Sequence, residues 1–262
     1  MSAKILILDI ETLPLLSYHW RCFKENISAK QVVDACYIAS YGAKWLGEKK
    51  HFYEDTSKQT EKQMLVKLLK LLSEADMIVG HNISGFDMKK IRGRCAVHRL
   101  PIPSPYKEVD TLRAAKNEFG FEINTLEYLA TVLKLTNRKS SHKKYPGFEL
   151  WLGTLNGERA AWQEMKHYCL QDVDTTEELY LRIRPYDRRH PNVSVYLDND
   201  EPTCPKCGST KLSPWPNRGY NKWAYTNVGK YPLHKCGGCG GNYRGRFQGT
   251  KVSKVGVTTH AQ

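Results

Sequence analysis

The sequence predicts an α/β domain, with a mixed sheet covered by helices on both faces, followed by a small module built around cysteines. Strand, hairpin, helix, strand, helix, strand, helix and helix patterns follow one another along the larger part of the chain, as in layered α/β folds. Four of the eight cysteines then form two Cys-x-x-Cys pairs. A length of 262 residues has room for one full core and such a module.

The first half of the predicted domain is built from a central strand, a hairpin and a helix. Lys4–Ile10 is apolar on both faces, as expected of a strand covered on both sides. Cys36–Trp45 and Lys49–Tyr53 flank a Gly-Glu turn and are predicted to form a hairpin that continues the sheet. Glu61–Leu72 carries apolar residues at helical spacing. Met77–Gly80 is predicted to be a short buried strand.

The second half alternates helices with one more strand. A helix is predicted at Phe86–His98 and a strand at Glu108–Leu112. Asn124–Lys134 is predicted to be a helix opened by a capping box that pairs its first residue with Glu127. A long helix, Glu158–Arg184, ends before a proline and closes the domain.

These patterns divide the chain at about residue 186. Residues 1–186 form the predicted domain, residues 187–202 look like a linker rich in Pro, Asn and charge, and residues 203–248 form the cysteine module. We expect the tail, residues 249–262, to be disordered. No run approaches about 18 apolar residues, which argues against a membrane span, and the first apolar run is too short for a signal peptide. We therefore expect a cytoplasmic protein.

The net charge of +13 is unevenly distributed. Residues 187–262 carry 12 Lys/Arg against 4 Asp/Glu, and the remaining residues carry 28 against 23. A basic excess of this size favours polyanionic partners, and we expect nucleic acid rather than a membrane surface. A basic protein kept soluble by its charge is the alternative.

Three acidic segments are candidates for a metal-dependent site. Asp9 and Glu11 alternate at the end of the first strand and therefore share one face, where they repel each other unless a divalent cation lies between them. Asp87 opens a helix after a polar turn, and Tyr168 and Asp172 are four residues apart on one helix face. Each segment taken alone is also compatible with a solvated charge.

Together the segments resemble the Exo I, Exo II and Exo III motifs of the DEDD exonuclease superfamily. The stretches LDIETLP, GHNISGFD and YCLQDVDTTEELY occur in the right order within residues 4–184, in wording similar to the proofreading domains of family B DNA polymerases. The resemblance implies a ribonuclease-H-like fold and a 3′–5′ exonuclease that acts on single-stranded or 3′-terminal DNA, or on RNA. It also implies two Mg²⁺ or Mn²⁺ ions, with Asp9 bridging both, Glu11 and Asp172 on the first, and Asp87 on the side of the second.

The superfamily divides into a tyrosine and a histidine subtype, and both residues are present here. Tyr168 precedes Asp172 by four residues and His167 precedes it by five. A regular helix turns His167 about 140° away from Asp172, so we favour Tyr168 as the residue that orients the attacking water. Asn82, five residues before Asp87, also fits the tyrosine subtype and is a candidate for substrate contact. We interpret Asp110, a further acidic residue, as structural.

The cysteine module resembles a zinc ribbon. Cys204, Cys207, Cys236 and Cys239 form two pairs, each followed by glycine, and are predicted to bind one structural Zn²⁺ through four thiolates. A redox-active dithiol is the alternative, disfavoured because a second pair matches the first. We expect the metal to supply much of the folding free energy of this module, since it contains few large aliphatic residues.

Basic and aromatic residues mark the candidate nucleic-acid contacts, although a protein partner of the ribbon stays possible. Besides Asn82, the candidates are Arg138, Lys143, Lys144, Arg218, Lys222, Trp223, Arg244 and Arg246. Two other functions remain open. One is a structure-specific endonuclease or resolvase on the same fold. The other is a non-catalytic adaptor, disfavoured because all four carboxylates are present.

Overall fold

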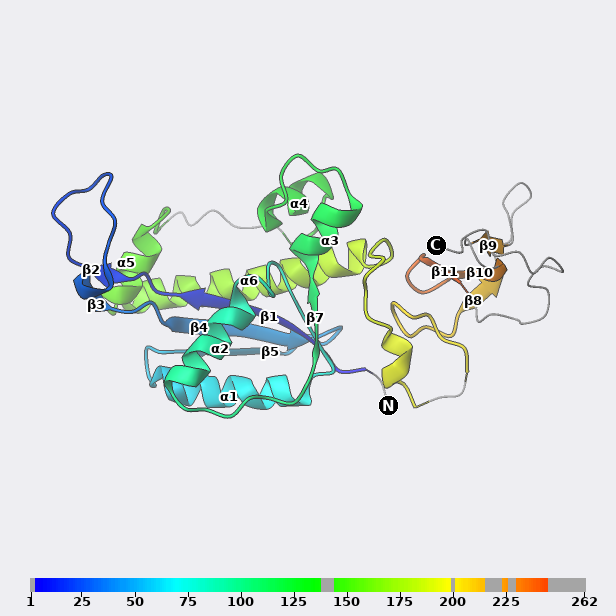
Figure 1. Cartoon of the computed structure of the whole chain (residues 1–262), viewed down its shortest axis with the longest axis horizontal. Coiled ribbons are helices and arrows are strands. Elements are labelled where there is room, and N and C mark those ends of the chain that lie inside the picture. The colour runs from blue at the N-terminus through cyan, green and yellow to red at the C-terminus, as the bar shows by residue number, and fades with distance from the viewer. Residues whose placement is uncertain (1–2, 138–143, 199–200, 215–222, 226–229, 245–262) are drawn as a thin grey trace, which may run out of the picture. The chain divides into compact units, whose positions relative to one another are not determined.

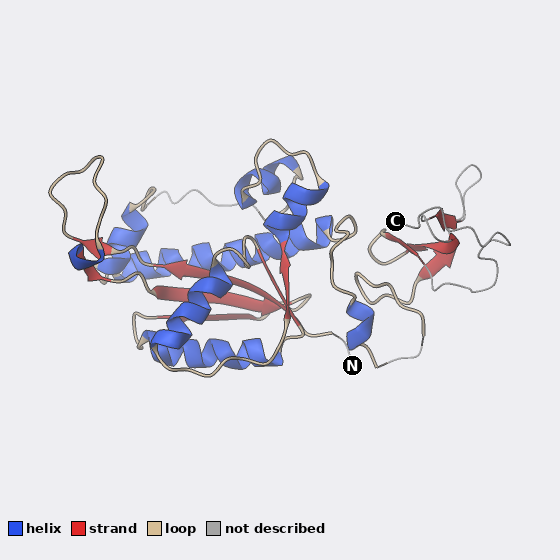
Figure 2. Ribbon diagram, viewed as in Figure 1, coloured by secondary structure: helices blue, strands red, loops and turns tan. Residues whose placement is uncertain are grey.

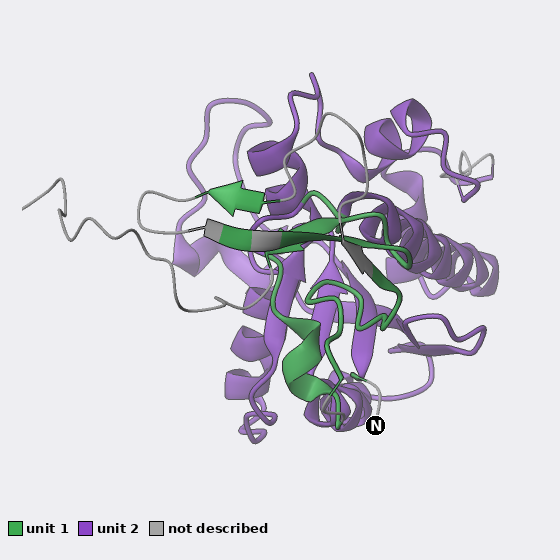
Figure 3. Ribbon diagram, turned by 90° about the vertical axis from the view of Figure 1, so that its right-hand side faces the viewer, with its two compact units in different colours: residues 1–3, 184–186, 190–262 green, residues 4–183, 187–189 purple. Residues whose placement is uncertain are grey.

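The computed structural model describes residues 3–137, 144–198, 201–214, 223–225 and 230–244. The chain divides into two compact units (Figure 3). The larger unit comprises Lys4–Ile183 and Asp187–Arg189, and the smaller comprises Met1–Ala3, Arg184–Tyr186 and His190–Gln262.

A five-stranded mixed sheet forms the centre of the larger unit, with the strand order β5-β4-β1-β6-β7 (Figures 1 and 2). The central strand β1 pairs antiparallel with β4 and parallel with β6, while β5 continues the antiparallel side and β7 the parallel side. The predicted mixed α/β architecture is therefore confirmed. The strand bounds are Ile5–Thr12 for β1, Ile38–Trp45 for β4, His51–Asp55 for β5, Met77–Gly80 for β6 and Lys107–Asp110 for β7.

Helices cover both faces of this sheet, as Figure 1 shows. On one face, α1 (Glu61–Glu74) and α2 (Asp87–Val97) form a core with Leu6, Leu8 and Ile10 of β1. On the other face, the long helix α6 (Arg159–Ile183) packs against β1 and β4. Three shorter helices then pack on α6: α3 (Thr111–Glu118), α4 (Leu126–Val132) and α5 (Glu149–Leu155).

Two local predictions are wrong, and two short helices are not predicted. The predicted strand to Leu112 ends instead at Asp110, because the Asp110 carboxylate accepts hydrogen bonds from the Leu112 and Arg113 amides and caps α3. Helix α4 is capped by Thr125, whose hydroxyl accepts from the Tyr128 amide, rather than by Asn124. The sequence patterns also give no indication of α3 or α5.

Residues 13–37, between β1 and β4, form a structured insertion that the sequence patterns do not predict. It contains strand β2 (Leu16–Ser17), the single-turn 3₁₀ helix Ala29–Gln31 and strand β3 (Val32–Asp34), with β2 and β3 antiparallel. In Figure 1 it is the dark blue loop that projects beyond the end of β1. We call residues 16–31 the insertion loop.

The smaller unit is organised around strand β10 (Lys230–Cys236). It pairs antiparallel with β8 (Leu212–Pro214), β9 (Trp223–Tyr225) and β11 (Asn242–Arg244). Within residues 187–202, which the sequence suggested as a linker, Val193–Tyr196 is a 3₁₀ helix, and the Val193 amide donates to the Pro205 carbonyl. Across the described residues of both units, the structure has no helix with the length and apolar character needed to cross a membrane.

Candidate functional site

Asp9 and Glu11 lie on the face of β1 that is covered by α6. Side chains alternate along a strand, and Leu8 and Ile10 point into the core beneath α1 and α2. Asp9 and Glu11 therefore point the opposite way, as the sequence predicts. Glu11 is only 8% exposed, and the neighbouring position to Asp9 on β4 is Gly42.

The absence of a side chain at Gly42 lets α6 approach the sheet closely. A Cβ atom there would lie 2.9 Å from Cys169 Sγ and 3.3 Å from the Cys169 carbonyl oxygen. Cys169 Sγ consequently lies 3.9 Å from Asp9 Oδ2, and the ligand atoms of Asp9, Glu11 and Cys169 are all within 4.8 Å of one another. The sequence patterns do not predict this contact of Cys169. Its helical spacing from the buried Met165 and Val173 was the available signal.

The same helix brings Tyr168 and Asp172 to the carboxylates. The Tyr168 hydroxyl is hydrogen-bonded to Asp172, and burial, followed by the negative charges of Asp172 and Glu11, raises its pKa far above the ordinary value. Tyr168 is therefore a neutral phenol whose hydroxyl donates a hydrogen bond to the Asp172 carboxylate. Trp151 of α5 packs edge-on against its ring, with centroids 6.2 Å apart. His167 is exposed.

Asp87 completes the acidic group from the other side of β1. Strand β6 pairs with β1 only as far as Ile7 and Val79. Beyond that point, the Ile10 amide donates to Asp87 Oδ1 at 3.2 Å. Asp87 is only 3% exposed, and burial raises the pKa of its carboxyl to about 7. A buried carboxyl that already accepts a backbone hydrogen bond would gain from a nearby cation, which favours its ionised form.

The turn between β6 and α2 is held by Asp110, which has a structural role here. Its carboxylate accepts from the Asn82 amide at 3.0 Å and the Ser84 amide at 3.4 Å, in addition to capping α3. Asn82 has a positive φ of 67°, and a Cβ at Gly85 would lie 2.3 Å from its side-chain oxygen. Any other residue at position 85 would therefore displace the Asn82 side chain, and this turn leads directly into Asp87 at the start of α2.

The donor set of this site fits hard divalent cations. The four carboxylates come from three elements. Complete burial, followed by the charges of these carboxylates, raises the pKa of the Cys169 thiol well above its ordinary value. Cys169 is thus a neutral thiol in an acidic setting. Carboxylate oxygens gathered in this way are the ligands that Mg²⁺ and Mn²⁺ prefer.

Comparison with known proteins places this unit in a family. A family model described as the RNase_H superfamily matches residues 6–184. The chain belongs to the RNase_H superfamily. Its structure is also similar to a family B DNA polymerase from the hyperthermophilic archaeon Pyrobaculum calidifontis, with a TM-score of 0.50 and 17% sequence identity over 71% of this chain. That match spans only 26% of the polymerase chain. At 17% identity, the likeness shows that the two matched regions share a fold. No curated protein matches the sequence significantly.

Superfamily membership supports a nuclease-type activity and therefore a nucleic-acid substrate. Asp9, Glu11, Asp87 and Asp172 all lie within the matched residues, on β1, at the start of α2 and on α6. The cysteine pairs lie outside the region that matches the RNase_H superfamily.

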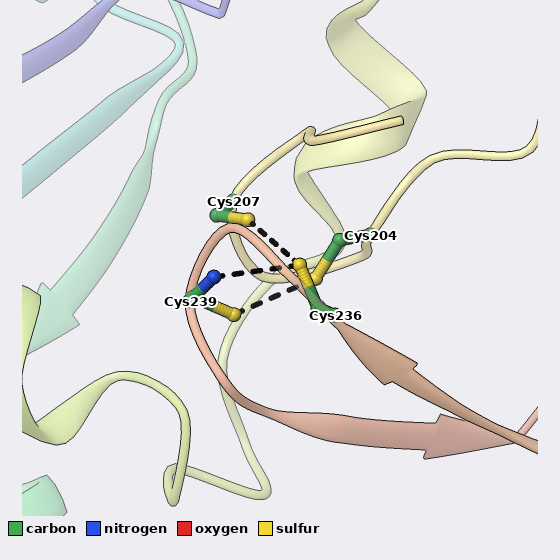
Figure 4. Close-up of side chains that lie close together, drawn as sticks. All are labelled: Cys204, Cys207, Cys236 and Cys239. Atoms are coloured by element: carbon green, nitrogen blue, oxygen red, sulfur yellow. Dashed lines mark hydrogen bonds between the residues drawn. The ribbon is translucent and has the colours of Figure 1, made fainter. Parts of the chain in front are cut away.

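The four cysteines of the smaller unit converge on one point (Figure 4). Cys204 Sγ lies 3.7 Å from Cys239 Sγ, and Cys207 Sγ lies 3.5 Å from Cys236 Sγ. A tetrahedral Zn²⁺ with Zn–S bonds of about 2.3 Å requires sulfurs about 3.8 Å apart. The cluster therefore has the dimensions of a zinc site. The hydrogen bond between Cys204 and Cys207 lowers the pKa of the Cys204 thiol and raises the pKa of the Cys207 thiol, so Cys204 is the thiol of this pair that ionises first.

The two cysteine pairs use the same turn. The Gly208 amide donates to the Cys204 carbonyl, and the Gly240 amide donates to the Cys236 carbonyl. Both glycines have positive φ, 71° and 78°, a conformation that glycine adopts without strain. In the second turn the Gly238 amide also faces Cys236 Sγ at 3.2 Å, as the motif predicts.

The candidate nucleic-acid contacts are only partly within the described residues. Lys144 lies over the Tyr145 ring, and Arg244 lies over the Tyr231 ring. Trp223 of β9 is partly exposed. Five candidates lie outside the described residues: Arg138, Lys143, Arg218, Lys222 and Arg246.

Proposed function

We propose that the protein is a metal-dependent 3′–5′ exonuclease of the DEDD type. The observation that carries this proposal is the gathering of Asp9, Glu11, Asp87 and Asp172 around one end of β1, in a chain of the RNase_H superfamily. Four carboxylates that lie around the same buried side chain, Cys169, repel one another unless cations neutralise them. Clusters of like charge that destabilise the fold in this way are typical of catalytic sites.

The chain's own residues would divide the work as follows. Asp9, Glu11 and Asp172 would hold one divalent cation, and Asp87 would serve a second. Such ions, when bound, lower the pKa of a water molecule and stabilise the charge that develops on a phosphate. Tyr168 would position the attacking water, because a phenol with a raised pKa holds its proton and orients a neighbour by hydrogen bonding.

The tyrosine subtype is favoured over the histidine subtype. Tyr168 is hydrogen-bonded to Asp172, whereas His167 is exposed. Trp151 restricts the tyrosine ring by packing against its edge, which reduces the freedom of the phenol before substrate binds.

We further propose that residues 203–248 form a zinc ribbon that holds one structural Zn²⁺ and aids nucleic-acid binding. The sulfur spacing and the two matching turns support the metal. The basic charge of this part of the chain supports the nucleic-acid role. Single-stranded or 3′-terminal DNA is the proposed substrate, with RNA as the alternative to be tested.

The experiment is hydrolysis of 5′-labelled single strands by the purified full chain with Mg²⁺ or Mn²⁺. We expect a ladder of products that shortens from the 3′ end, with DNA, RNA or both. Asp9→Ala should abolish the ladder, and the matched control Glu48→Ala, which removes an exposed carboxylate on the turn before β5, should not. No ladder with either polymer, or an undiminished ladder from Asp9→Ala, would contradict the proposal. Cleavage of circular single strands would indicate an endonuclease instead.

A further inference from the structure

Three aromatic side chains are displayed on the insertion loop. The side chain of Trp20 is 95% exposed, that of Phe23 is 83% exposed and that of Tyr18 is 76% exposed. Large aromatic residues normally bury most of their surface, because burial of their rings is strongly favourable. One such ring on a surface is ordinary, but three exposed rings within six residues of one loop point to a ligand.

The insertion loop is folded, so this exposure is not that of an open chain. The Tyr18 backbone amide donates to the Gln31 backbone carbonyl at 2.9 Å, and the Gln31 side-chain Nε2 donates to the Tyr18 backbone carbonyl at 3.0 Å. Inside the loop, the Glu25 carboxylate accepts from the Trp20 and Arg21 amides. The hydrogen bond from Arg21 is the main reason that the pKa of Glu25 lies below its ordinary value. Polar groups therefore fill the inside of the loop while the rings point outward.

The insertion loop lies beyond the end of β1 that carries the acidic site. Residues 13–15 connect it to β1, and the chain returns to the sheet at Ile38, which pairs with Thr12. Trp20 is nine residues from Glu11, so the two are at most about 30 Å apart. Asp87 lies near the same end of β1, since its carboxylate accepts a hydrogen bond from the Ile10 amide.

The chemistry of the loop matches single-stranded nucleic acid. Its residues include three Lys/Arg (Arg21, Lys24 and Lys30) against one acidic residue, Glu25. Cations attract the phosphates of a strand, and aromatic rings stack on its bases without sequence preference. A duplex offers no unstacked bases to such rings, whereas a single strand does.

We propose that the insertion loop is a stacking clamp that holds the single strand whose 3′ end enters the acidic site. This inference rests on the proposed exonuclease function, and it names the part of the substrate that the loop would contact. Trp20 and Phe23 would stack on bases upstream of the scissile phosphate, and Arg21 and Lys24 would contact the backbone. The preformed hydrogen bonds of the loop reduce the ordering cost of binding.

The test measures binding separately from hydrolysis. A fluorescein-labelled oligothymidylate is titrated with the full-length Asp9→Ala protein in buffer without added Mg²⁺ or Mn²⁺ and without a chelator, which would remove the proposed structural zinc, and affinity is read from anisotropy. In that background, Trp20→Ala and Phe23→Ala should each weaken binding by about 5- to 150-fold, which is the value of stacking on one base, about 1–3 kcal/mol, converted at 1.4 kcal/mol per tenfold. Trp20→Phe keeps a ring and should retain most of the affinity.

The matched control is Ile102→Ala, which removes an equally exposed apolar side chain (91%) outside the loop and should bind as the parent does. In the catalytically intact protein, Trp20→Ala should slow hydrolysis of long strands more than hydrolysis of a dinucleotide, because a long strand offers more bases to the loop.

Unchanged oligonucleotide affinity in both Trp20→Ala and Phe23→Ala would overturn the clamp, whatever the activity of the enzyme. A change in oligomeric state in these variants, with unchanged affinity, would assign the patch to protein contact and would also overturn it. If the exonuclease proposal is wrong, the wild-type chain will give no metal-dependent ladder in the hydrolysis assay. The two failures are therefore distinguishable.

Discussion

A methyl group added at Gly42 tests whether α6 is held against the sheet as tightly as the structure shows. In Gly42→Ala, the new Cβ would lie 2.9 Å from Cys169 Sγ, 3.1 Å from Val173 Cγ2 and 3.3 Å from the Cys169 carbonyl oxygen. The last of these is helix backbone, so the helix must move by a few tenths of an ångström. Overpacking of this kind costs about 1–3 kcal/mol. Alanine recovers about 0.5–1 kcal/mol of backbone entropy, which leaves a net loss of about 1–2 kcal/mol.

The assay is thermal unfolding followed by circular dichroism, combined with the strand-shortening assay. For a unit of this size, each kcal/mol shifts Tm by about 2–4 °C, so Gly42→Ala should lower Tm by about 2–8 °C. Activity should fall further, by about 100-fold, because Tyr168 and Asp172 move with the helix and misplaced catalytic groups are costly. Gly93→Ala is the matched control, since nothing lies within 4 Å of its Cβ on helix α2. It should raise Tm by about 1–4 °C and leave activity unchanged.

A Gly42→Ala protein that is as stable and as active as the wild type would contradict the close packing of α6 against the sheet. A double variant adds a second check. Cys169→Ala removes the sulfur that the new methyl group meets first, so it should restore part of the Tm that Gly42→Ala loses. A double variant with strictly additive losses would show that the two residues do not pack as described.

Three further predictions concern the tyrosine, the zinc and an ion pair. Tyr168→Phe should lower the hydrolysis rate by about 100-fold, while His167→Ala should change it less than about twofold; the opposite ranking, measured in the strand assay, would favour the histidine subtype. Elemental analysis should find about one zinc per chain, lost in Cys204→Ser, and an undiminished zinc content in that variant would contradict the four-cysteine site. Glu61 is buried and forms an ion pair with Arg94 at 2.6 Å. Glu61→Gln should lower the free energy of unfolding by about 2–3 kcal/mol, which is less than the loss for a fully buried ion pair because Arg94 is partly exposed. Burial raises the pKa of Glu61, but hydrogen bonds from Arg94 and others lower it overall, so its stabilisation is present above about pH 4.5 and is lost as the pH falls below that. As the pH is lowered below about 4.5, the Tm of Glu61→Gln should therefore fall less steeply than that of the wild type. An equally steep fall of Tm in the two proteins would contradict this.

The long, periodic elements could be predicted from sequence, but the short elements fixed by tertiary contacts could not. Strand β6 matches its predicted bounds and α6 differs by one residue at each end, because both carry continuous patterns of burial. Helix α3 has eight residues and is started by Asp110, which is also bound to a distant turn. No local pattern contains that information. The insertion loop was missed because strands of two and three residues have no period to detect.

Within the candidate site, the sequence predicts the relative positions of residues that lie on the same strand or helix. Alternation along β1 places Asp9 and Glu11 on one face, and helical geometry places Tyr168 beside Asp172. The contact of Asp87 with the Ile10 amide depends on where β6 stops pairing, and the packing of Cys169 against Asp9 depends on Gly42 of a third element. These relations need the folded chain.

The central claim is that the acidic group is a binding site for catalytic divalent cations. Anomalous diffraction from crystals soaked in Mn²⁺ tests it most directly, because the signal locates the metal without reference to activity. We predict anomalous peaks within bonding distance of Asp9 and Glu11 in the wild type and their loss in Asp9→Asn. Crystals that take up Mn²⁺ elsewhere, with no peak at these carboxylates, would contradict the account.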